Sequence, residues 1–300
     1  MAKNRGKIVE QYRRLIKKAE PSLGNGNLKI MATGLFSLAV IADDKYVFRF
    51  PLEREEGKWY LGEKKFLDKI APLIHSAQIP AVTLYDVDGI IFTKHRLIEG
   101  ETYSAVKGEK KCSPELKQNL AAGLAKFCAE LHSVGAESFD LEQFTVERYD
   151  VEKKFNILAE FFNNRREIIL DILNAIDFIK NYRHVDEKLN VLCHNDLNEN
   201  NIIVDVENQK LAGVIDFCNG IRRNFNIEFA PMAKYDFGLT RLMAEEYQKL
   251  TGRTVDLGYV VSAQKIRCYG GIIHFLENKN EKLLRLFTKF SRYLKRIKIG

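Results

Sequence analysis

The stretch from Val191 to Phe217 reads VLCHNDLNENNIIVD (191–205), VENQK (206–210) and LAGVIDF (211–217). Two apolar runs, 202–204 and 211–215, lie on either side of a turn-like segment and predict a β-hairpin. Polar residues crowd the loop before the first run, and a carboxylate ends the second. Carboxylates at the ends of apolar strands are costly to bury without partners, so a metal ion, a catalytic role or a hydrogen-bond network must supply them.

A two-residue turn at 208–209 would bring Asn201 opposite Asp216 at the open end of this hairpin. Two oxygen donors then converge close to a second carboxylate, Asp196, five residues before Asn201. Hard oxygen donors of this kind suit Mg²⁺, which completes its octahedron with water and phosphate. The alternative is a polar loop in which Asn and Asp side chains bond their own backbone.

Strand signals dominate the first hundred residues. Residues 28–50 predict three antiparallel strands with a turn at Asp43-Asp44, and two further strands are predicted around 82–87 and 90–92. One helix is predicted between them, at 58–75, because its apolar residues recur at helical spacing.

Helical periodicity dominates the rest of the chain. Ser113 followed by a proline is a favourable cap and first turn for a long helix that ends at His132. A second helical stretch covers 151–183, the hairpin region follows, and helices then run to the end. The sequence therefore predicts an α+β protein with a β-rich front part and an α-helical back part.

Charge is unevenly distributed along the 300 residues. The net charge of +7 comes from residues 1–18 (+6) and 282–300 (+7), which leaves −6 for the remainder. Both basic ends have the spacing of amphipathic helices. They either contact an anionic surface or nucleic acid, or pack on the body with solvated basic faces. Because the body is acidic, no nucleic-acid partner is expected.

Composition points to an ordinary globular protein of the cytoplasm. Hydrophobic residues make up 46% and charged residues 29% of the chain. No window reaches the roughly 18 apolar residues of a membrane span, and the N-terminus does not have a secretory signal pattern. Five cysteines, an odd number without a C-x-x-C pair, argue against a disulfide framework and a zinc site.

The residues His194-Asn195-Asp196, Asn201 and Ile215-Asp216-Phe217 follow the pattern H-x-D-x-x-x-x-N, strand, turn, and strand ending in Asp. This pattern resembles the catalytic signature of the protein-kinase-like fold. The chain most resembles the aminoglycoside phosphotransferases, and among them the group that modifies the 2″ hydroxyl. The resemblance implies a bilobal fold, with a small antiparallel β-sheet N-lobe (1–98) that binds nucleotide and a mainly α-helical C-lobe (99–300) for catalysis and substrate.

The resemblance also implies roles for the loop residues. Asp196 would accept the proton of the attacking hydroxyl or orient it. Asn201 and Asp216 would hold Mg²⁺ on the nucleotide phosphates. His194 would brace the loop by hydrogen bonds rather than act as a base.

The same resemblance places the binding site for ATP or GTP in the N-terminal part of the chain. The segment Gly34 to Ser37 is similar to the family's nucleotide loop, whose backbone amides cover phosphates. Arg49 would bind phosphates, and Glu63 on the following helix would hold Arg49.

Three positions depart from the family pattern. Arg49 stands where protein kinases use lysine, and the two side chains are not equivalent at a phosphate. Cys218 replaces the glycine after Asp216-Phe217, which removes backbone freedom. Glu228 falls where relatives carry an aspartate that organises the catalytic loop.

Acidic residues near the expected substrate side favour a polycationic substrate, and basic residues there oppose one. A polycationic aminoglycoside needs carboxylates there, and the candidates are Glu228, Asp236, Glu245 and Glu246. Bases in the same region oppose such a substrate; they are Arg222, Arg223 and Lys234.

The sequence as a whole predicts a Mg²⁺-dependent phosphotransferase that moves the terminal phosphoryl group of ATP or GTP to a hydroxyl of a small molecule. An aminoglycoside is the leading acceptor, and choline, a sugar or another alcohol are the alternatives, because function resides in the site and not in the fold. A protein kinase is a further alternative, although Ala230-Pro231-Met232 lacks the A-P-E signature. A non-catalytic nucleotide-binding or interaction module is a third.

Overall fold

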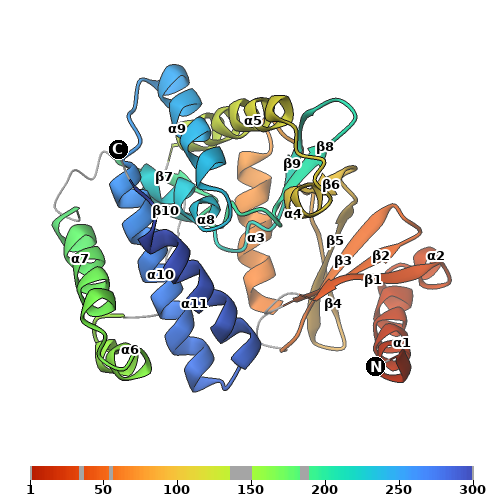
Figure 1. The fold of residues 1–300 in the computed structure, drawn as a ribbon. Coiled ribbons are helices and arrows are strands. Elements are labelled where there is room, and N and C mark those ends of the chain that lie inside the picture. The colour runs from red at the N-terminus through yellow and green to blue at the C-terminus, as the bar shows by residue number, and fades with distance from the viewer. Residues whose placement is uncertain (1, 34–36, 54–56, 136–150, 183–188, 299–300) are drawn as a thin grey trace.

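The architecture is α+β, as predicted (Figure 1). A computed structural model describes residues 2–33, 37–53, 57–135, 151–182 and 189–298. An antiparallel sheet lies at one side of the molecule, and helices make up most of the remainder. Helix α3 (Lys58–Ile70) lies between them, and its apolar residues join the large core of the helical part. The helix ends before the predicted residue 75 because the chain turns after Ile70.

Five strands form the antiparallel sheet, in the order β1-β2-β3-β5-β4. Asp43 and Asp44 both have φ of 53° and form the predicted turn between the second and third strands. Left-handed residues match the twist of such a hairpin. The strand bounds are β1 Leu28–Thr33, β2 Ser37–Ala42, β3 Tyr46–Pro51, β4 Thr83–Val87 and β5 Ile90–Arg96.

The basic N-terminal segment forms helix α1 (Ala2–Ala19), followed by the short α2 (Pro21–Gly24). Leu15 and Ile16 of α1 are buried against the sheet in the same core cluster as Phe50. The segment therefore packs on the body, which is the second of the two interpretations given above.

The basic C-terminal segment behaves in the same way. It forms helix α11 (Glu281–Lys295), in which Leu294 is buried and Phe287 and Phe290 pack against the main core. The described lysines and arginines of this helix are largely exposed. Its basic face is thus solvated in this chain, as on many helices.

Eight helices besides α1 to α3 lie in the described residues. Ser113 caps α5 by accepting a hydrogen bond from the backbone N–H of Leu116 at 3.0 Å, as predicted. The predicted stretch 151–183 is two helices, because Asn163 and Asn164 take left-handed backbone angles that end the first. The helix bounds are α4 Tyr103–Gly108, α5 Pro114–Ser133, α6 Phe155–Phe161, α7 Arg166–Tyr182, α8 Ala230–Ala233, α9 Phe237–Thr251, α10 Leu257–Glu277 and α11 as above.

The predicted hairpin is present as β8 (Ile202–Asp205) and β9 (Lys210–Val214), but its register differs. Ile202 pairs with Val214, and the N–H of Ile215 donates to the carbonyl oxygen of Asn201. The predicted pairing of Asn201 with Asp216 is therefore wrong by one residue. The turn has four residues rather than two, because the Asp205 side chain accepts from the N–H of Asn208, and a register shift follows in the ladder.

Two short strand pairings were not expected from the sequence. Strand β6 (Glu101–Thr102) extends the hairpin into a three-stranded sheet. Strand β10 (Ile221–Asn224) pairs with β7 (Asn190–Cys193), in a stretch where only helices were expected. A short 3₁₀ helix, η5 (Phe225–Phe229), follows β10. These pairings fix both ends of the loop that precedes β8.

Among the described residues, no helix combines the length and apolar character needed to cross a bilayer. All five cysteines are free thiols.

Candidate active site

The loop between β7 and β8, residues 194–201, carries Asp196 in a defined orientation. The Asp196 carboxylate accepts hydrogen bonds from Asn198 Nδ2 at 3.0 Å and from Asn201 Nδ2 at 3.3 Å. Asn201 Nδ2 also donates to the backbone oxygen of Asp196 at 2.9 Å. Because two side-chain amides hold one carboxylate, its position is set before any ligand arrives.

The electrostatic surroundings of Asp196 favour proton uptake. Burial raises the pKa of Asp196, and the negative charge of Asp216 raises it further. The positive charge of Lys234 acts in the opposite direction but does not outweigh the first two. A carboxylate with a raised pKa is a stronger proton acceptor once it is ionised.

His194 braces the loop from inside. Its side chain is fully buried, and Nε2 donates to the carbonyl oxygen of Ile215, 3.0 Å away. Its Nδ1 then accepts the N–H of Asp196 at 3.2 Å. The carbonyl partner of Nε2 fixes this tautomer, since a carbonyl oxygen only accepts. Both ring nitrogens are therefore engaged within the loop.

Glu228, from η5, holds the same loop from its other side. Its carboxylate is fully buried and accepts the backbone N–H groups of His194 at 2.6 Å and Asn195 at 3.1 Å. Burial alone would raise the pKa of Glu228, but interactions with His132 and His194 outweigh it and lower the pKa. The carboxylate therefore stays ionised and ties η5 to the loop.

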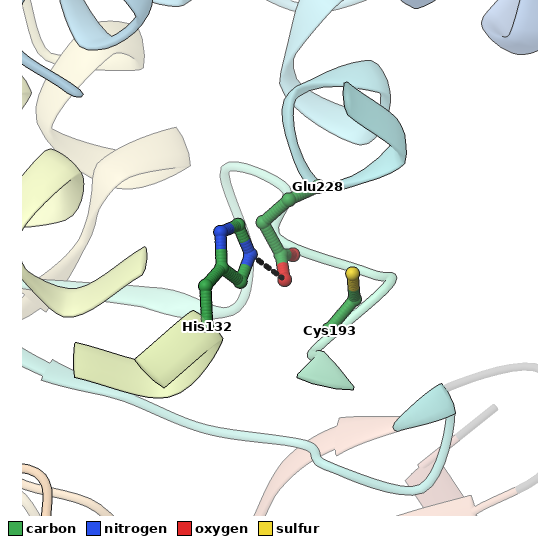
Figure 2. A group of neighbouring side chains, drawn as sticks. All are labelled: His132, Cys193 and Glu228. Atoms are coloured by element: carbon green, nitrogen blue, oxygen red, sulfur yellow. Dashed lines mark ion pairs between the residues drawn. The ribbon is translucent and has the colours of Figure 1, made fainter. Parts of the chain in front are cut away.

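His132, Cys193 and Glu228 form a buried group whose potential ligand atoms lie within 4.8 Å of one another (Figure 2). His132, at the end of α5, points Nε2 toward Glu228 Oε2, 3.7 Å away, while its Nδ1 contacts the Tyr247 hydroxyl at 2.8 Å. A metal does not fit here, because both Glu228 oxygens already accept N–H groups and burial raises the pKa of the Cys193 thiol. The group is a brace for the loop, and the sequence indicated His132 only as a helix end.

Arg49 connects the sheet to the hairpin region. Its Nη1 donates to both carboxylate oxygens of Glu63, at 2.6 and 2.8 Å, and its Nη2 donates to Asp216 Oδ1 at 2.8 Å. Glu63 is fully buried on α3 and also accepts the N–H of Phe217 at 3.0 Å. Strand β3, helix α3 and the end of the hairpin therefore meet at one guanidinium group.

Glu63, Asp216 and Cys218 form a second group of potential ligand atoms within 4.8 Å of one another. Arg49 is bonded to all three of them, with Nη2 at 3.5 Å from the Cys218 sulfur. A guanidinium cation already fills this position, so the three side chains are not a cation site together.

Asn201 and Asp216 retain the oxygen atoms that a magnesium ion needs. Asn201 spends its amide N–H groups on Asp196, and in the described part of the chain its Oδ1 accepts no hydrogen bond. Asp216 uses Oδ1 for Arg49, which leaves Oδ2 without a hydrogen bond from the described residues. One amide oxygen and one carboxylate oxygen are a hard donor set that fits Mg²⁺.

Two predicted nucleotide-loop residues have different outcomes. Gly34 lies outside the described residues. Ser37 begins β2 and pairs with Pro51, the last residue of the strand that carries Arg49. Ser37 is therefore on the same part of the sheet as Arg49.

Arg267 of α10 is a site residue that sequence reasoning missed. Its guanidinium donates to the backbone oxygen of Asn195 at 2.9 Å and also bonds the Asn195 side-chain oxygen. Asn195 has φ of 65°, a left-handed conformation that these contacts support. The only sequence signal is a charged residue in a helix with many buried positions, 71 residues after Asp196.

The acidic residues considered for the substrate side are largely engaged elsewhere. Asp236 caps α9, bonds the Tyr103 hydroxyl at 2.8 Å and pairs with Lys117 at 2.8 Å. Glu246 pairs with Lys249, and Glu245 is exposed on the same helix. The sequence did not single out Glu199, which lies three residues after Asp196 and pairs with Lys107 at 2.9 Å.

The basic residues considered for the same side occupy two positions. Arg222 and Arg223 are exposed on β10. Lys234 is partly buried at the end of α8, close enough to influence the pKa of Asp196.

Comparison with known proteins identifies the family. The family model described as "Phosphotransferase enzyme family" matches residues 37–247. This segment is more than half of the chain and contains the whole arrangement of Arg49, Glu63, Asp196, Asn201 and Asp216.

Solved structures share the fold over almost the whole chain. The GDP and kanamycin complex of an APH(2″) protein superposes with a TM-score of 0.77 at 16% identity, covering 95% of this chain and 98% of that one. ADP-bound aminoglycoside phosphotransferase APH(2″)-Ib gives 0.64 at 24% identity, with coverage of 95% and 96%. Macrolide 2′-phosphotransferase MphH from Brachybacterium faecium gives 0.64 at 14% identity, with coverage of 97% and 100%. At these identities the likeness establishes the shared fold.

Proposed function

This chain belongs to the phosphotransferase enzyme family, and we propose that it moves the terminal phosphoryl group of ATP or GTP to a hydroxyl of a small molecule in a Mg²⁺-dependent reaction. It is an enzyme, a phosphotransferase with an alcohol group as acceptor. The observation that carries the proposal is the convergence of Asp196, Asn201 and Asp216 beside the Arg49–Glu63 pair.

Asp196 takes the proton of the acceptor hydroxyl in this proposal. The side-chain amides of Asn198 and Asn201 orient its carboxylate, and burial with the nearby Asp216 charge raises its pKa. The hydroxyl oxygen then attacks the terminal phosphorus, and the nucleoside diphosphate leaves. Phosphoryl transfer depends mainly on such positioning and on charge stabilisation.

Asn201 Oδ1 and Asp216 Oδ2 are the oxygens proposed to hold Mg²⁺. The ion, when bound, neutralises charge on the phosphate oxygens. The side-chain amide of Asn201 has two roles in this proposal. Its N–H groups orient Asp196, and its oxygen is available to bind Mg²⁺.

Arg49 is proposed to bind nucleotide phosphates, with Glu63 fixing its guanidinium through two hydrogen bonds. Gly34 and Ser37 are assigned to the loop that covers the phosphates. In this proposal residues 1–98 bind the nucleotide and residues 99–300 supply catalysis and the acceptor site. Free thiols at all five cysteines suit a reaction in the reducing cytoplasm.

Aminoglycosides are the first acceptors to assay. Kanamycin and gentamicin are named in the complexes of proteins that share this fold, and macrolide phosphotransferases share it as well. Choline and sugars are the alternatives, since one fold supports many acceptors.

A protein substrate is not favoured by the chain after Asp216. Strand β10 and η5 fill the fully described stretch between Phe217 and Ala230. A long activation segment of the protein-kinase type has no room there.

The test is nucleotide turnover with Mg²⁺ and a panel of kanamycin, gentamicin, choline, sugars and sugar phosphates, supplied with ATP and with GTP. We expect the wild-type protein to phosphorylate at least one acceptor and Asp196→Ala to lose that activity. Asp177→Ala, which changes an exposed aspartate on α7, is the matched control and should retain it. Nucleotide binding by both wild type and Asp196→Ala without turnover on any acceptor would make this a binding module.

A further inference from the structure

Lys234 lies in an aromatic setting, close enough to Asp196 for its positive charge to lower the pKa of that carboxyl group. Its ammonium lies over the rings of Tyr235, Phe287 and Phe290, with centroid distances of 4.9, 5.3 and 5.4 Å. The first ring follows α8 and the other two come from α11. Three aromatic faces hold the lysine head in place without neutralising it.

Nearby lysines show how different this environment is. Lys107 pairs with Glu199 at 2.9 Å, and Lys117 pairs with Asp236 at 2.8 Å. Within the described parts of the chain, Lys234 is in no ion pair, although it is partly buried. Burial lowers the pKa of Lys234, and the charges of Cys268, Asp196 and Glu199, which raise it, do not outweigh burial. A partly buried cation without a partner calls for an anion from outside the chain.

Arg267 supplies a second positive charge on the same side. Its guanidinium is bonded to both oxygens of Asn195, the residue next to Asp196, and so has a fixed position. It too has no ion-pair partner among the described residues. Burial lowers the pKa of Arg267, and the Asp196 charge raises it. Two cations therefore lie close to the carboxylate that accepts the proton.

Three of the four carboxylates considered for a polycationic acceptor are engaged elsewhere, and the fourth, Glu245, is exposed on α9. Glu228 is buried under the loop, and Asp236 is tied to Lys117. Glu246 bonds Lys249 and Gln118. The charges of Lys234 and Arg267 near Asp196 therefore oppose a polycationic acceptor, since charges of one sign repel a ligand of the same sign.

We propose that the acceptor alcohol carries an anionic group, a carboxylate or a phosphate, which Lys234 binds beside Asp196. Hydroxy acids and sugar phosphates are the chemical classes that fit. This inference rests on the proposed function and narrows its acceptor. Arg267 supports it by holding positive charge close to the reacting hydroxyl.

The reaction balances without a further reagent. The acceptor hydroxyl oxygen forms a bond to the terminal phosphorus of the nucleoside triphosphate. The bond from that phosphorus to the bridging oxygen breaks, and the nucleoside diphosphate takes the electron pair. The hydroxyl proton passes to Asp196, while the anionic group of the acceptor stays on Lys234 unchanged.

The transferred phosphoryl group is the other source of anionic oxygen at this place. If Lys234 served that group, its loss would lower turnover equally for every acceptor. If it serves the acceptor, its loss acts on the KM of anionic acceptors alone. The split between kcat and KM therefore distinguishes the two sources.

The experiment measures phosphorylation of kanamycin, glucose, glucose 6-phosphate and glycerate by wild type, Lys234→Met, Lys234→Arg and Lys234→Glu. We expect wild type to prefer the two anionic acceptors. Lys234→Met should raise their KM about 10- to 100-fold, the range for losing one hydrogen bond to a charged group, and leave the KM for nucleotide within about 3-fold. Lys234→Arg should restore most of the affinity, and Lys289→Met, an exposed lysine of α11, is the matched control.

Lys234→Glu should shift preference toward kanamycin, because it reverses the charge that the acceptor meets. Preference of the wild type for kanamycin, or an equal fall in kcat for all four acceptors in Lys234→Met, would overturn the inference and leave the phosphotransferase proposal standing. Absence of any Asp196-dependent transfer would instead contradict the proposed function itself. A thermal melt of each variant separates loss of binding from loss of folding.

Discussion

The loop 194–201 has a carboxylate on each of its two faces, Asp196 on one and Glu228 on the other, and their surroundings shift the two pKa values in opposite directions. On one face Asp196 is partly exposed, is held by side-chain amides, and has a pKa raised by burial and by a like charge. On the other face Glu228 is fully buried, is held by backbone N–H groups, and has a pKa that its partners lower in spite of burial. The donors around each carboxylate decide which of them is ready to take a proton.

This difference separates function from stability within one loop. An ionised Asp196 is destabilising in the folded state, since burial and the Asp216 charge both disfavour its charge. An ionised Glu228 is stabilising, because the groups around it are donors that have no other acceptor. In the loop, the charge is therefore disfavoured at Asp196 and favoured at Glu228, where it braces the loop against the core.

Asp196→Asn tests the disfavoured charge and should give the largest effect. We expect kcat to fall about 10²- to 10⁴-fold, because the proton acceptor is lost. The stability of the metal-free variant at pH 7 should stay within about 1 kcal/mol of wild type, since removal of a disfavoured charge offsets the loss of one acceptor for Asn198 or Asn201. Steady-state kinetics and urea unfolding measure the two quantities, and a loss of stability as large as that of Glu228→Gln would contradict the comparison.

Glu228→Gln tests the braced face. The free energy of unfolding should fall by about 3 kcal/mol, because one oxygen becomes an N–H₂ group that faces backbone donors in a buried site. Urea unfolding by circular dichroism measures it. Glu245→Gln on the exposed face of α9 is the control and should change stability by less than about 0.5 kcal/mol. Equal stability of the two variants would mean that Glu228 does not brace the loop.

His132→Phe should have a smaller effect, about 1 to 2 kcal/mol, since it removes the contact with the Tyr247 hydroxyl and one partner of Glu228. A double-mutant cycle with Glu228→Gln should give a coupling of at least about 0.5 kcal/mol, because the two side chains share one interaction. Additive effects would place His132 outside the brace.

The smallest expected effects are changes in stability with pH, which should have opposite signs for Asp196 and Glu228. Because folding raises the pKa of Asp196, protonated Asp196 stabilises the metal-free fold at pH values below 3.8, the ordinary pKa of an aspartate. This stabilisation is lost as the pH rises through the raised pKa. Because folding lowers the pKa of Glu228, ionised Glu228 stabilises the fold at pH values above 4.5, the ordinary pKa of a glutamate. This stabilisation is lost as the pH falls through the lowered pKa. Relative to wild type, Asp196→Asn should therefore gain stability as pH rises from 3 to 7, and Glu228→Gln should lose it. Parallel curves for the two variants would contradict these opposite signs.

Much of the fold could be predicted from local patterns. Alternating and helical spacing gave the five-stranded sheet and α5 with its cap, and the turn residues Asp43 and Asp44 placed the hairpin between β2 and β3. These signals are local because neighbouring residues alone set a turn or a helix end. The hairpin register failed for a local reason too, since Asp205 bonds Asn208 and lengthens the turn.

The candidate site was predicted where a motif names its residues. Asp196, Asn201 and Asp216 follow a fixed spacing, and the structure brings them together beside Arg49. Arg267 could not be found in this way. Its contact with Asn195 depends on how α10 packs against the loop, and packing between distant segments leaves no regular spacing in the sequence.

Glu63 has a consequence for regulation. A fully buried carboxylate on α3 accepts donors from β3 and from the residue after Asp216, so α3 cannot swing outward without leaving that charge unpaired. Separation of such a buried pair costs about 3 to 5 kcal/mol. At that cost fewer than about one molecule in a hundred has the helix displaced at any time. If the chain acts as proposed, its output therefore follows the supply of nucleotide and acceptor rather than a movement of α3.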